Sequence, residues 1–306
     1  MAKLFKSRES EPMKKCGYAT IIGKTNVGKS TFLNNFLDKK VSITSNKSQT
    51  TRSNIYAVKS TENCQIIFID TPGTHKKTEK TINKILRKKP KEVIHDVDVI
   101  LFMVSGTKFD DIDKETLKIV NSSKAKKILL INKIDLLKNK NELFPFVEKT
   151  FLNQGFDSII PISSTKDEGL DIVQSELEKL MPENDFFYPA EGFDFQSQTF
   201  EITETIREKV IRLLGDELPY QTAVVLDVFQ DQHDQINIDA TIYVAKESQK
   251  KIVIGEEGTK IKSIGTKARI DLEEKYNKKV FLSLWCKVKK NWINDPVTLE
   301  SFGIKN

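Results

Sequence analysis

The sequence predicts a doubly wound α/β domain followed by a smaller α+β domain with the order α-β-β-α-α-β. Up to about residue 181, short apolar runs alternate with amphipathic segments, and from residue 200 this rhythm is lost. Between the two lies a stretch of Pro, Gly and acidic residues that is typical of a linker, although its aromatic residues could instead pack against one of the domains. We expect a disordered tail over 1–15, the α/β domain over 16–182, the linker over 183–199 and the second domain over 200–306.

The elements of the first domain follow one another in a regular order. Strands are expected at 18–23, 65–70, 97–104, 126–132 and 158–163, and helices at 31–37, 78–89, 113–123 and 169–181. The strands are apolar nearly throughout, which is typical of a parallel sheet covered on both faces. Ligands of such sheets bind at the carboxyl ends of the strands.

The second domain begins with a helix over 200–218, in which Ile202, Ile206 and Val210 lie on or near one face. Two strands at 222–230 and 236–245 follow, joined by a polar turn. Two helical segments on either side of a short turn at 255–258 then lead to a last strand at 280–289. This is the α-β-β-α-α-β order.

Composition and termini indicate a soluble protein with ample core. The chain has 306 residues, of which 38% are hydrophobic and 30% charged. Its longest apolar run, at about 97–104, is too short to span a bilayer. The N-terminal tail is charged and lacks a hydrophobic signal region, so we expect a cytoplasmic location. The three cysteines and three histidines have no metal-ligand or disulfide spacing.

Charge is unevenly distributed along the chain. Residues 1–180 carry 32 basic and 22 acidic residues, whereas residues 181–306 carry 17 and 21. Within that acidic half, residues 260–290 hold 10 basic and 3 acidic residues. A local basic segment of this kind is a candidate contact for a polyanion.

The segment GKTNVGKS at 23–30 matches the phosphate-binding pattern G-x-x-x-x-G-K-S. Gly23 and Gly28 would let the backbone wrap a phosphate chain with its own N–H groups. Lys29 would reach the terminal phosphates, and the Ser30 hydroxyl would coordinate Mg²⁺. The alternative is a glycine-rich turn without a ligand.

Two further motifs, DTPG at 70–73 and NKID at 132–135, each follow a predicted strand. Asp70 stands where a strand-end carboxylate can hold Mg²⁺, and the amide of Gly73 can meet the γ-phosphate. Asp135 could accept both the ring N–H and the exocyclic amine of guanine, a pair that adenine does not offer. Asn132 would brace the loop and Lys133 would lay its aliphatic stem over the base. The pattern favours GTP over ATP.

Further characteristic segments are SITSNKSQTTRSNI, DTPGTH, PISS, IGEEGTKIKSIGTKAR and LWCKVKKNW. With these and the motifs above, the sequence resembles the Era family of ribosome-associated GTPases over nearly the whole chain after the tail. The resemblance implies a P-loop GTPase domain joined to a KH-type RNA-binding domain. It also implies roles for single residues. Thr51, with Thr50 as the adjacent alternative, resembles the switch threonine that senses the γ-phosphate and completes Mg²⁺ coordination. Asn26 resembles a P-loop asparagine that helps to hold K⁺, and Ser163 and Ser164 stand where relatives usually have Ser-Ala.

The expected nucleotide site has three groups of residues. The groups are the binding residues Asn26, Val27, Gly28, Lys29, Ser30, Thr31, Asp70, Asn132, Lys133, Asp135, Ser163 and Ser164; Lys29, Thr51 and Gly73 for catalysis; and Ser30, Thr51 and Asp70 for Mg²⁺. The reaction would be attack of water on the γ-phosphoryl group. Because Thr74, and not glutamine, follows Gly73, we expect a slow intrinsic rate. K⁺ at Asn26 or a ribosomal partner could supply the missing charge.

The turn GEEG at 255–258 has the G-x-x-G form with which KH domains clamp a nucleic-acid backbone. The carboxylates of its two glutamates should lower the affinity for RNA phosphates unless the charge of nearby lysines outweighs them. The expected RNA-binding residues are Gly255, Glu256, Glu257, Gly258, Lys260, Lys262, Lys287, Lys289 and Lys290. Trp285 and Trp292 are interpreted as core or rim packing and not as platforms for bases.

These observations favour a GTP-hydrolysing switch that binds small-subunit ribosomal RNA, by resemblance its 3′ end, and that assists or monitors assembly of the small ribosomal subunit. An alternative is an RNA-binding scaffold whose nucleotide site is structural and hydrolyses poorly. An ATP-using nucleotide kinase would share only the phosphate loop and is opposed by NKID. We expect a monomer, and the basic segment 76–91 could contact the ribosome or the inner face of the cell membrane.

Overall fold

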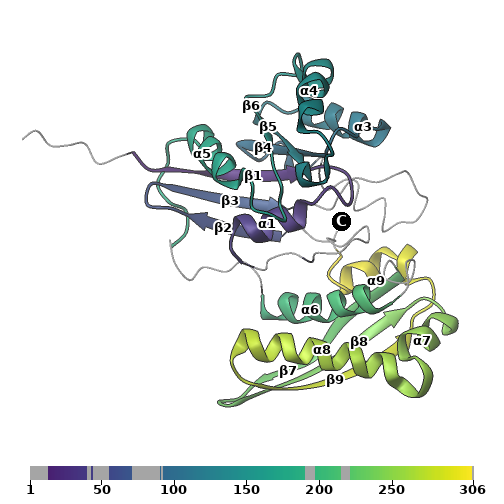
Figure 1. Cartoon of the computed structure of the whole chain (residues 1–306). Coiled ribbons are helices and arrows are strands. Elements are labelled where there is room, and N and C mark those ends of the chain that lie inside the picture. The colour runs from purple at the N-terminus through teal and green to yellow at the C-terminus, as the bar shows by residue number, and fades with distance from the viewer. Residues whose placement is uncertain are drawn as a thin grey trace, which may run out of the picture.

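A computed structural model describes residues 13–39, 43, 55–70, 90, 92–189, 197–214 and 221–304. Two domains stand one above the other in Figure 1, each with its own sheet. The fold class expected from the sequence is confirmed for both. Thr51 and Gly73, and the helix expected at 78–89, lie outside the described residues.

The sheet of the N-terminal domain has six strands in the order β2-β3-β1-β4-β5-β6. Neighbouring strands are parallel except β2, which is antiparallel to β3. Because β1 lies between β3 and β4, the strand order reverses there, and the loop after β1 is the expected place for a ligand. The strands are β1 (Lys15–Ile22), β2 (Ile55–Ser60), β3 (Cys64–Asp70), β4 (Val99–Ser105), β5 (Lys126–Asn132) and β6 (Ser158–Pro161).

Helices cover both faces of this sheet. Phe32 of α1 and Leu177 of α5 belong to one buried apolar cluster, and Val120 of α3 and Phe151 of α4 belong to another. The described helices are α1 (Lys29–Phe36), α3 (Asp111–Asn121), α4 (Leu143–Phe151) and α5 (Leu170–Leu180), with 3₁₀ turns at Ile134–Leu136 and Lys140–Glu142. The doubly wound arrangement is therefore confirmed, while β2 and α4 are additional elements that the sequence analysis missed.

The stretch that follows α5 lies along β1 and β3. Cys16 N donates to Pro182 O at 3.0 Å. The buried Gln65 side chain donates to Tyr188 O at 2.9 Å and accepts from Tyr188 N at 3.1 Å. The Phe187 ring lies 5.7 Å from that of Tyr18. Phe187 and Tyr188 thus pack against the α/β domain.

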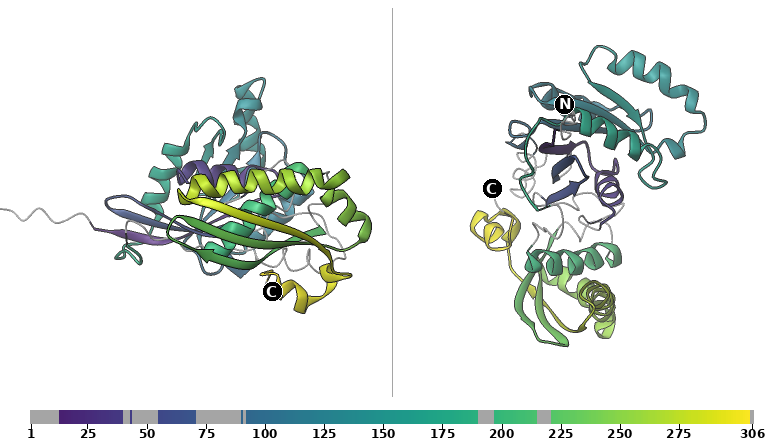
Figure 2. Two further views of the ribbon diagram at one scale, coloured as in Figure 1. Left: turned by 90° about the horizontal axis from the view of Figure 1, so that it is seen from below. Right: turned by 90° about the vertical axis from the view of Figure 1, so that its left-hand side faces the viewer.

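The C-terminal domain has the predicted order α6 (Gln198–Leu213), β7 (Thr222–Asp231), β8 (Gln235–Val244), α7 (Glu247–Ile254), α8 (Thr259–Tyr276) and β9 (Lys279–Val288). Its sheet has the order β7-β8-β9, with β9 at an edge and parallel to β8. The helices lie on one side of this sheet (Figure 2, right). Their apolar residues, among them Ile206, Val253 and Ala268, share one core with alternate residues of the strands.

A 3₁₀ turn (Trp292–Asn294) and a short helix, α9 (Pro296–Ser301), follow β9 and were not predicted. Trp292 is completely buried with Leu299 and Ala223, so the packing role expected for it is confirmed. Trp285 is 61% exposed, so it does not belong to the core, and of the two expected positions only the rim remains. None of the helices in the described ranges is long and apolar enough to cross a membrane.

Candidate nucleotide site and RNA interface

The loop after β1 depends on two close approaches of the backbone. A Cβ on Gly23 would lie 2.4 Å from the carbonyl oxygen of Met103, because β4 passes directly beside this point. Gly28 has a φ of +108°, and a Cβ there would lie 2.1 Å from Asn132 Nδ2. Both positions therefore require glycine. The phosphate-loop pattern and this geometry agree.

Lys29 opens α1 and folds back over the loop. Its side chain is buried, and Nζ donates to Gly23 O at 3.0 Å and to Lys24 O at 2.9 Å. Gly28 is the N-cap of α1 and makes no side-chain capping bond, so amide N–H groups of the first turn face the loop. Ser30 and Thr31 lie in the same turn. A cation beside a helix N-terminus is an arrangement that binds phosphate.

Asn132 joins the loops that follow three different strands. Its side chain is 1% exposed, and Nδ2 donates to Val27 O of the phosphate loop at 2.8 Å. Its Oδ1 accepts from Lys133 N at 2.8 Å, and from the backbone N and the hydroxyl of Ser164 at 3.0 Å each. The phosphate loop, NKID and the Ser-Ser loop therefore share one buried side chain.

The carboxylate expected to recognise guanine is oriented by a neighbouring loop. Ser163 Oγ donates to Asp135 Oδ1 at 2.7 Å. Lys133 has a φ of +65°, and its Nζ donates to Asn26 O at 2.6 Å, so its side chain spans from NKID to the phosphate loop. Burial lowers the pKa of Lys133, the charge of Lys24 lowers it further, and Asp135 opposes both effects.

A contact that the motifs did not indicate fixes the Ser-Ser loop. Asn35 of α1 donates from Nδ2 to Ser164 O at 2.7 Å and to Asp167 Oδ1 at 3.0 Å. Since Asn35 lies outside the phosphate-loop pattern, only the fold brings it to this loop.

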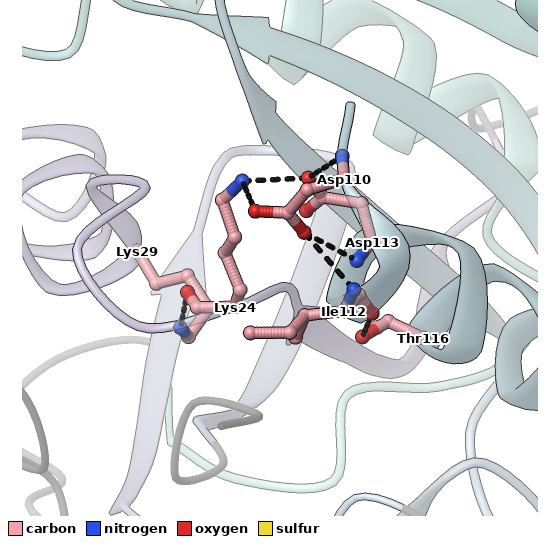
Figure 3. A network of polar contacts seen from close by, with 6 residues as sticks. All are labelled: Lys24, Lys29, Asp110, Ile112, Asp113 and Thr116. Atoms are coloured by element: carbon pink, nitrogen blue, oxygen red, sulfur yellow. Dashed lines mark hydrogen bonds and ion pairs between the residues drawn. The ribbon is translucent and has the colours of Figure 1, made fainter. Parts of the chain in front are cut away.

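A second unpredicted network ties the phosphate loop to α3 (Figure 3). Lys24 Nζ lies 2.6 Å from Asp113 Oδ2 and 2.9 Å from Asp110 Oδ2. Asp110 also caps α3 by accepting from the backbone N of Ile112 and Asp113. Because the carbonyl of Lys24 accepts from Lys29, the network holds the residue that positions the Lys29 ammonium.

Burial affects both partners of this ion pair. The Asp113 side chain is fully buried, which raises its pKa although the hydrogen bond from Lys24 opposes the rise. Burial would lower the pKa of Lys24, but the hydrogen bonds to Asp113 and Asp110 outweigh it and raise the pKa above the ordinary lysine value. Because the pair is largely buried, removal of either partner would leave the other in an unfavourable site.

The remaining expected nucleotide residues are placed only in part. Asp70 ends β3 and pairs in register with Ile21 of β1, which puts its backbone beside the phosphate loop. Asn26 is exposed, with a φ of +64°. Thr51 and Gly73 lie outside the described residues.

The GEEG turn joins α7 to α8 with its glycines in positive φ, +75° at Gly255 and +76° at Gly258. Gly258 is the N-cap of α8, which has 18 residues. A Cβ on Gly258 would have no atom within 4 Å, so the space beside it is open. An open glycine at a long helix N-terminus lets a phosphate approach the backbone.

A groove of about 250 Å³ lies between α8 and β9 beside this turn. Its lining residues are Ile261, Lys262, Gly265, Thr266 and Arg269 of α8, with Leu282 and Leu284 of β9. Lys260 and Lys262 are exposed near its GEEG end.

The other lysines expected to bind RNA do not share this groove. Along β9, Val280 and Cys286 belong to the core, so Lys287, at an odd position, points to the opposite face of the sheet. Lys289 lies over the ring of Phe302, 5.4 Å from its centroid. Lys290 follows on the exposed surface. The expected set is therefore divided between two faces.

A phosphate loop with NKID at the carboxyl ends of a doubly wound sheet, followed by a G-x-x-G domain, defines a guanine-nucleotide-binding protein of the P-loop class with a nucleic-acid-binding module. Comparisons with known proteins agree. A family described as "50S ribosome-binding GTPase" matches residues 18–133, and the KH domain family matches residues 217–293.

Relatives match almost the whole chain. GTPase Era of Coxiella burnetii (strain Dugway 5J108-111) is 43% identical over 290 residues, which cover 95% of this chain and 98% of the relative. GTPase Era of Haemophilus ducreyi is 42% identical over 298 residues, covering 96% and 97%. The chain therefore belongs to the Era family of GTPases.

Solved structures lead to the same family. An Era variant of Aquifex aeolicus bound to GDP and AlF₄⁻ has a TM-score of 0.91 at 32% identity, covering 95% of this chain and all of that one. Era in complex with MgGDPNP and nucleotides 1506–1542 of 16S ribosomal RNA has a TM-score of 0.92 at 33% identity, covering 96% and 100%.

Proposed function

We propose that this chain is a GTP-hydrolysing switch that binds small-subunit ribosomal RNA and assists or monitors assembly of the small ribosomal subunit. The observation that carries the proposal is the single buried Asn132 that joins the phosphate loop, NKID and the Ser-Ser loop. Because one side chain connects the phosphate-binding and base-binding loops, nucleotide contacts at one loop are transmitted to the others.

Guanine specificity rests on Asp135. The Ser163 hydroxyl bonds to one of its oxygens, which fixes the plane of the carboxylate for a two-point contact with the guanine edge. ATP offers no matching donor pair, so it would leave the acceptor unpaired. Lys133 is tied to Asn26, and its aliphatic stem is available to cover the base.

Hydrolysis rests on positioning and electrostatics. Lys29 and the first-turn amides of α1 would stabilise charge that develops on the phosphates. Ser30, Asp70 and Thr51 would hold Mg²⁺, and the register that pairs Asp70 of β3 with Ile21 of β1 supports this set, because β1 leads directly into the phosphate loop. When bound, the ion would neutralise phosphate charge. The Gly73 amide completes the proposed set.

A slow intrinsic rate follows from the absence of glutamine after Gly73, where Thr74 stands. Enzymes of this class turn over at about 10⁻⁴ s⁻¹ without a supplied positive charge, and at about 10⁻² s⁻¹ with an arginine from their own chain. We include K⁺ at Asn26 in the proposal, because Asn26 has a positive φ at the outer side of the loop and its side chain carries an oxygen ligand.

RNA binding rests on the GEEG turn and the groove beside it. The turn presents open backbone at the N-terminus of α8, and the groove has an apolar wall from β9 and basic side chains from α8. The family description for the first domain names the 50S ribosome, whereas the Era complex contains 16S ribosomal RNA. We favour the 16S RNA, because that relative covers both domains and the family description covers one.

The runner-up function is an RNA-binding scaffold with a structural nucleotide site. Turnover of radiolabelled GTP and ATP, with and without small ribosomal subunits, separates the two. The proposal requires Mg²⁺-dependent turnover of GTP, but not of ATP, that small subunits accelerate. Tight GTP binding without turnover under either condition would favour the scaffold.

Location in the cell belongs to the proposal as well. We place the protein in the cytoplasm as a monomer, with peripheral contact to the inner face of the membrane through the basic segment 76–91. Apart from Pro90, that segment lies outside the described residues. Cell fractionation with a Lys-to-Ala series in this segment tests the membrane contact.

A further inference from the structure

The edge strand β9 carries a pattern that the proposed nucleotide switch does not use. Its core-facing residues include Val280, Leu282, Leu284 and Cys286, and all of them belong to the domain core. The alternate residues are exposed and form what we call the basic-aromatic stripe: Lys279, Phe281, Ser283, Trp285 and Lys287.

The aromatic rings of the stripe are the unusual feature. Phe281 and Trp285 are each 61% exposed, although rings of this size are ordinarily buried. They lie four residues apart on the same face of a strand, which separates their Cα atoms by roughly 13 Å. Each ring is therefore a separate platform. The rest of this sheet face is covered near Tyr243 by the C-terminal cluster that contains α9.

The charge of the stripe indicates what it binds. A lysine stands at each end of the aromatic pair, and β9 contains no acidic residue. The acids on the neighbouring strands include Asp239 of β8, opposite Ser283, and Asp227 of β7, which accepts from the hydroxyl of Thr241 beside Trp285. Exposed aromatic rings between cations are the arrangement with which sheets bind unpaired nucleotides, because bases stack on rings and lysines attract phosphates.

We propose that the basic-aromatic stripe is a second single-stranded RNA surface, on which Phe281 and Trp285 each stack an unpaired base. This inference rests on the proposed RNA-binding function. The same strand lines the groove beside GEEG with Leu282 and Leu284, so RNA leaving the groove reaches the stripe by passing around one sheet edge. RNA on this path would contact both faces of the sheet, which would explain why the lysines expected to bind RNA lie on two faces.

The two tryptophans make the proposal directly measurable. Trp292 is completely buried, whereas Trp285 is 61% exposed, so acrylamide quenching of the fluorescence reports mainly on Trp285. The probe is RNA of nucleotides 1506–1542 of 16S ribosomal RNA, titrated into the full chain. Binding should protect Trp285 and lower the quenching constant toward that of Trp285→Phe, in which only the buried Trp292 emits.

Affinity of the same RNA provides the second readout. Trp285→Ala and Phe281→Ala should each weaken binding about 5- to 150-fold, the range measured for one stacked base. Trp285→Phe keeps a ring and should bind within about threefold of wild type. The matched control is Val297→Ala, which also removes an exposed apolar side chain, here 76% exposed. It should bind as wild type does, and circular dichroism should show all variants folded.

Each outcome decides the question. If Trp285→Ala and Phe281→Ala bind RNA normally and RNA leaves Trp285 unprotected, while Gly258→Asp loses binding, the basic-aromatic stripe does not bind RNA. The proposed function would then still stand. If the wild-type chain does not bind this RNA, the proposed function itself fails. If wild type sediments as a dimer that Trp285→Ala dissociates, the stripe is an interface between copies and the RNA proposal is wrong.

Discussion

Replacing Asn132 with alanine should uncouple the three loops of the nucleotide site. The side chain makes four hydrogen bonds to nitrogen and oxygen atoms, with Val27 O, Lys133 N, Ser164 N and Ser164 Oγ, and a fifth, weak one from Nδ2 to Met103 Sδ. The Ser164 hydroxyl can rotate to another partner, and Lys133 is partly exposed and can recruit water. Val27 O and Ser164 N would be left buried without this partner, at about 1–3 kcal/mol each. We therefore expect a loss of about 2–6 kcal/mol in the free energy of unfolding of the N-terminal domain.

The same change should weaken GDP binding by at least about tenfold, because the three loops are no longer held in one fixed arrangement. Urea denaturation followed by circular dichroism measures stability, and a fluorescent GDP analogue measures affinity. Tryptophan fluorescence reports on the C-terminal domain, which holds both tryptophans, and its transition should not move unless the domains unfold together. Asn139→Ala is the control, since Asn139 Oδ1 accepts one exposed bond from Asn141 N. If Asn132→Ala is as stable as this control and binds GDP as tightly, Asn132 does not connect the loops.

Three further predictions concern other parts of the chain. Lys24→Met should lower the free energy of unfolding by about 3 kcal/mol and slow GTP turnover, because it leaves the buried Asp113 carboxylate without its cation. Lys114→Met, which breaks an exposed ion pair, should lower the free energy of unfolding by under about 1 kcal/mol. Since the pKa of Lys24 is raised, its stabilisation should be complete below the ordinary lysine pKa and be lost as pH rises beyond it. Replacing K⁺ with Na⁺ should slow hydrolysis, and Asn26→Ala should remove this difference; equal rates in both salts would exclude the K⁺ site. Gly258→Asp should weaken RNA binding, whereas Gly155→Asp, at a glycine of similar φ with equally open space, should not.

How much could be predicted from the sequence depends on the kind of signal. Buried parallel strands such as 97–104 are recognisable in the sequence as apolar runs. Because the three nucleotide motifs follow such strands, the sheet and the kind of ligand at its edge were predictable. The edge strand β2 was missed because Tyr56 and Lys59 interrupt its apolar pattern. Helix α4 was missed because Pro145 suggests a break, although a proline in the first turn of a helix is tolerated.

The parts of the site that escaped prediction depend on contacts distant in sequence. The bond from Ser163 to Asp135 joins residues 28 apart, and that from Lys24 to Asp113 joins residues 89 apart. No local pattern records which side chains will meet across the sheet edge. Trp285 was interpreted as core or rim packing, as was Trp292. Because it lies on the outward-facing side of the edge strand β9, it is 61% exposed and does not belong to the core.

The most direct test of the central claim is the nucleotide preference of Asp135→Asn. If Asp135 reads the guanine edge, the variant should bind GTP about 5- to 150-fold more weakly and prefer xanthosine triphosphate, which presents an acceptor where guanine presents its exocyclic amine. Asp171→Asn, at an exposed position in the first turn of α5, serves as the control and should keep wild-type preference. Competition binding of GTP, ATP and xanthosine triphosphate measures all three affinities. A variant that keeps wild-type preference for GTP would contradict the assignment of this site as a guanine-specific switch.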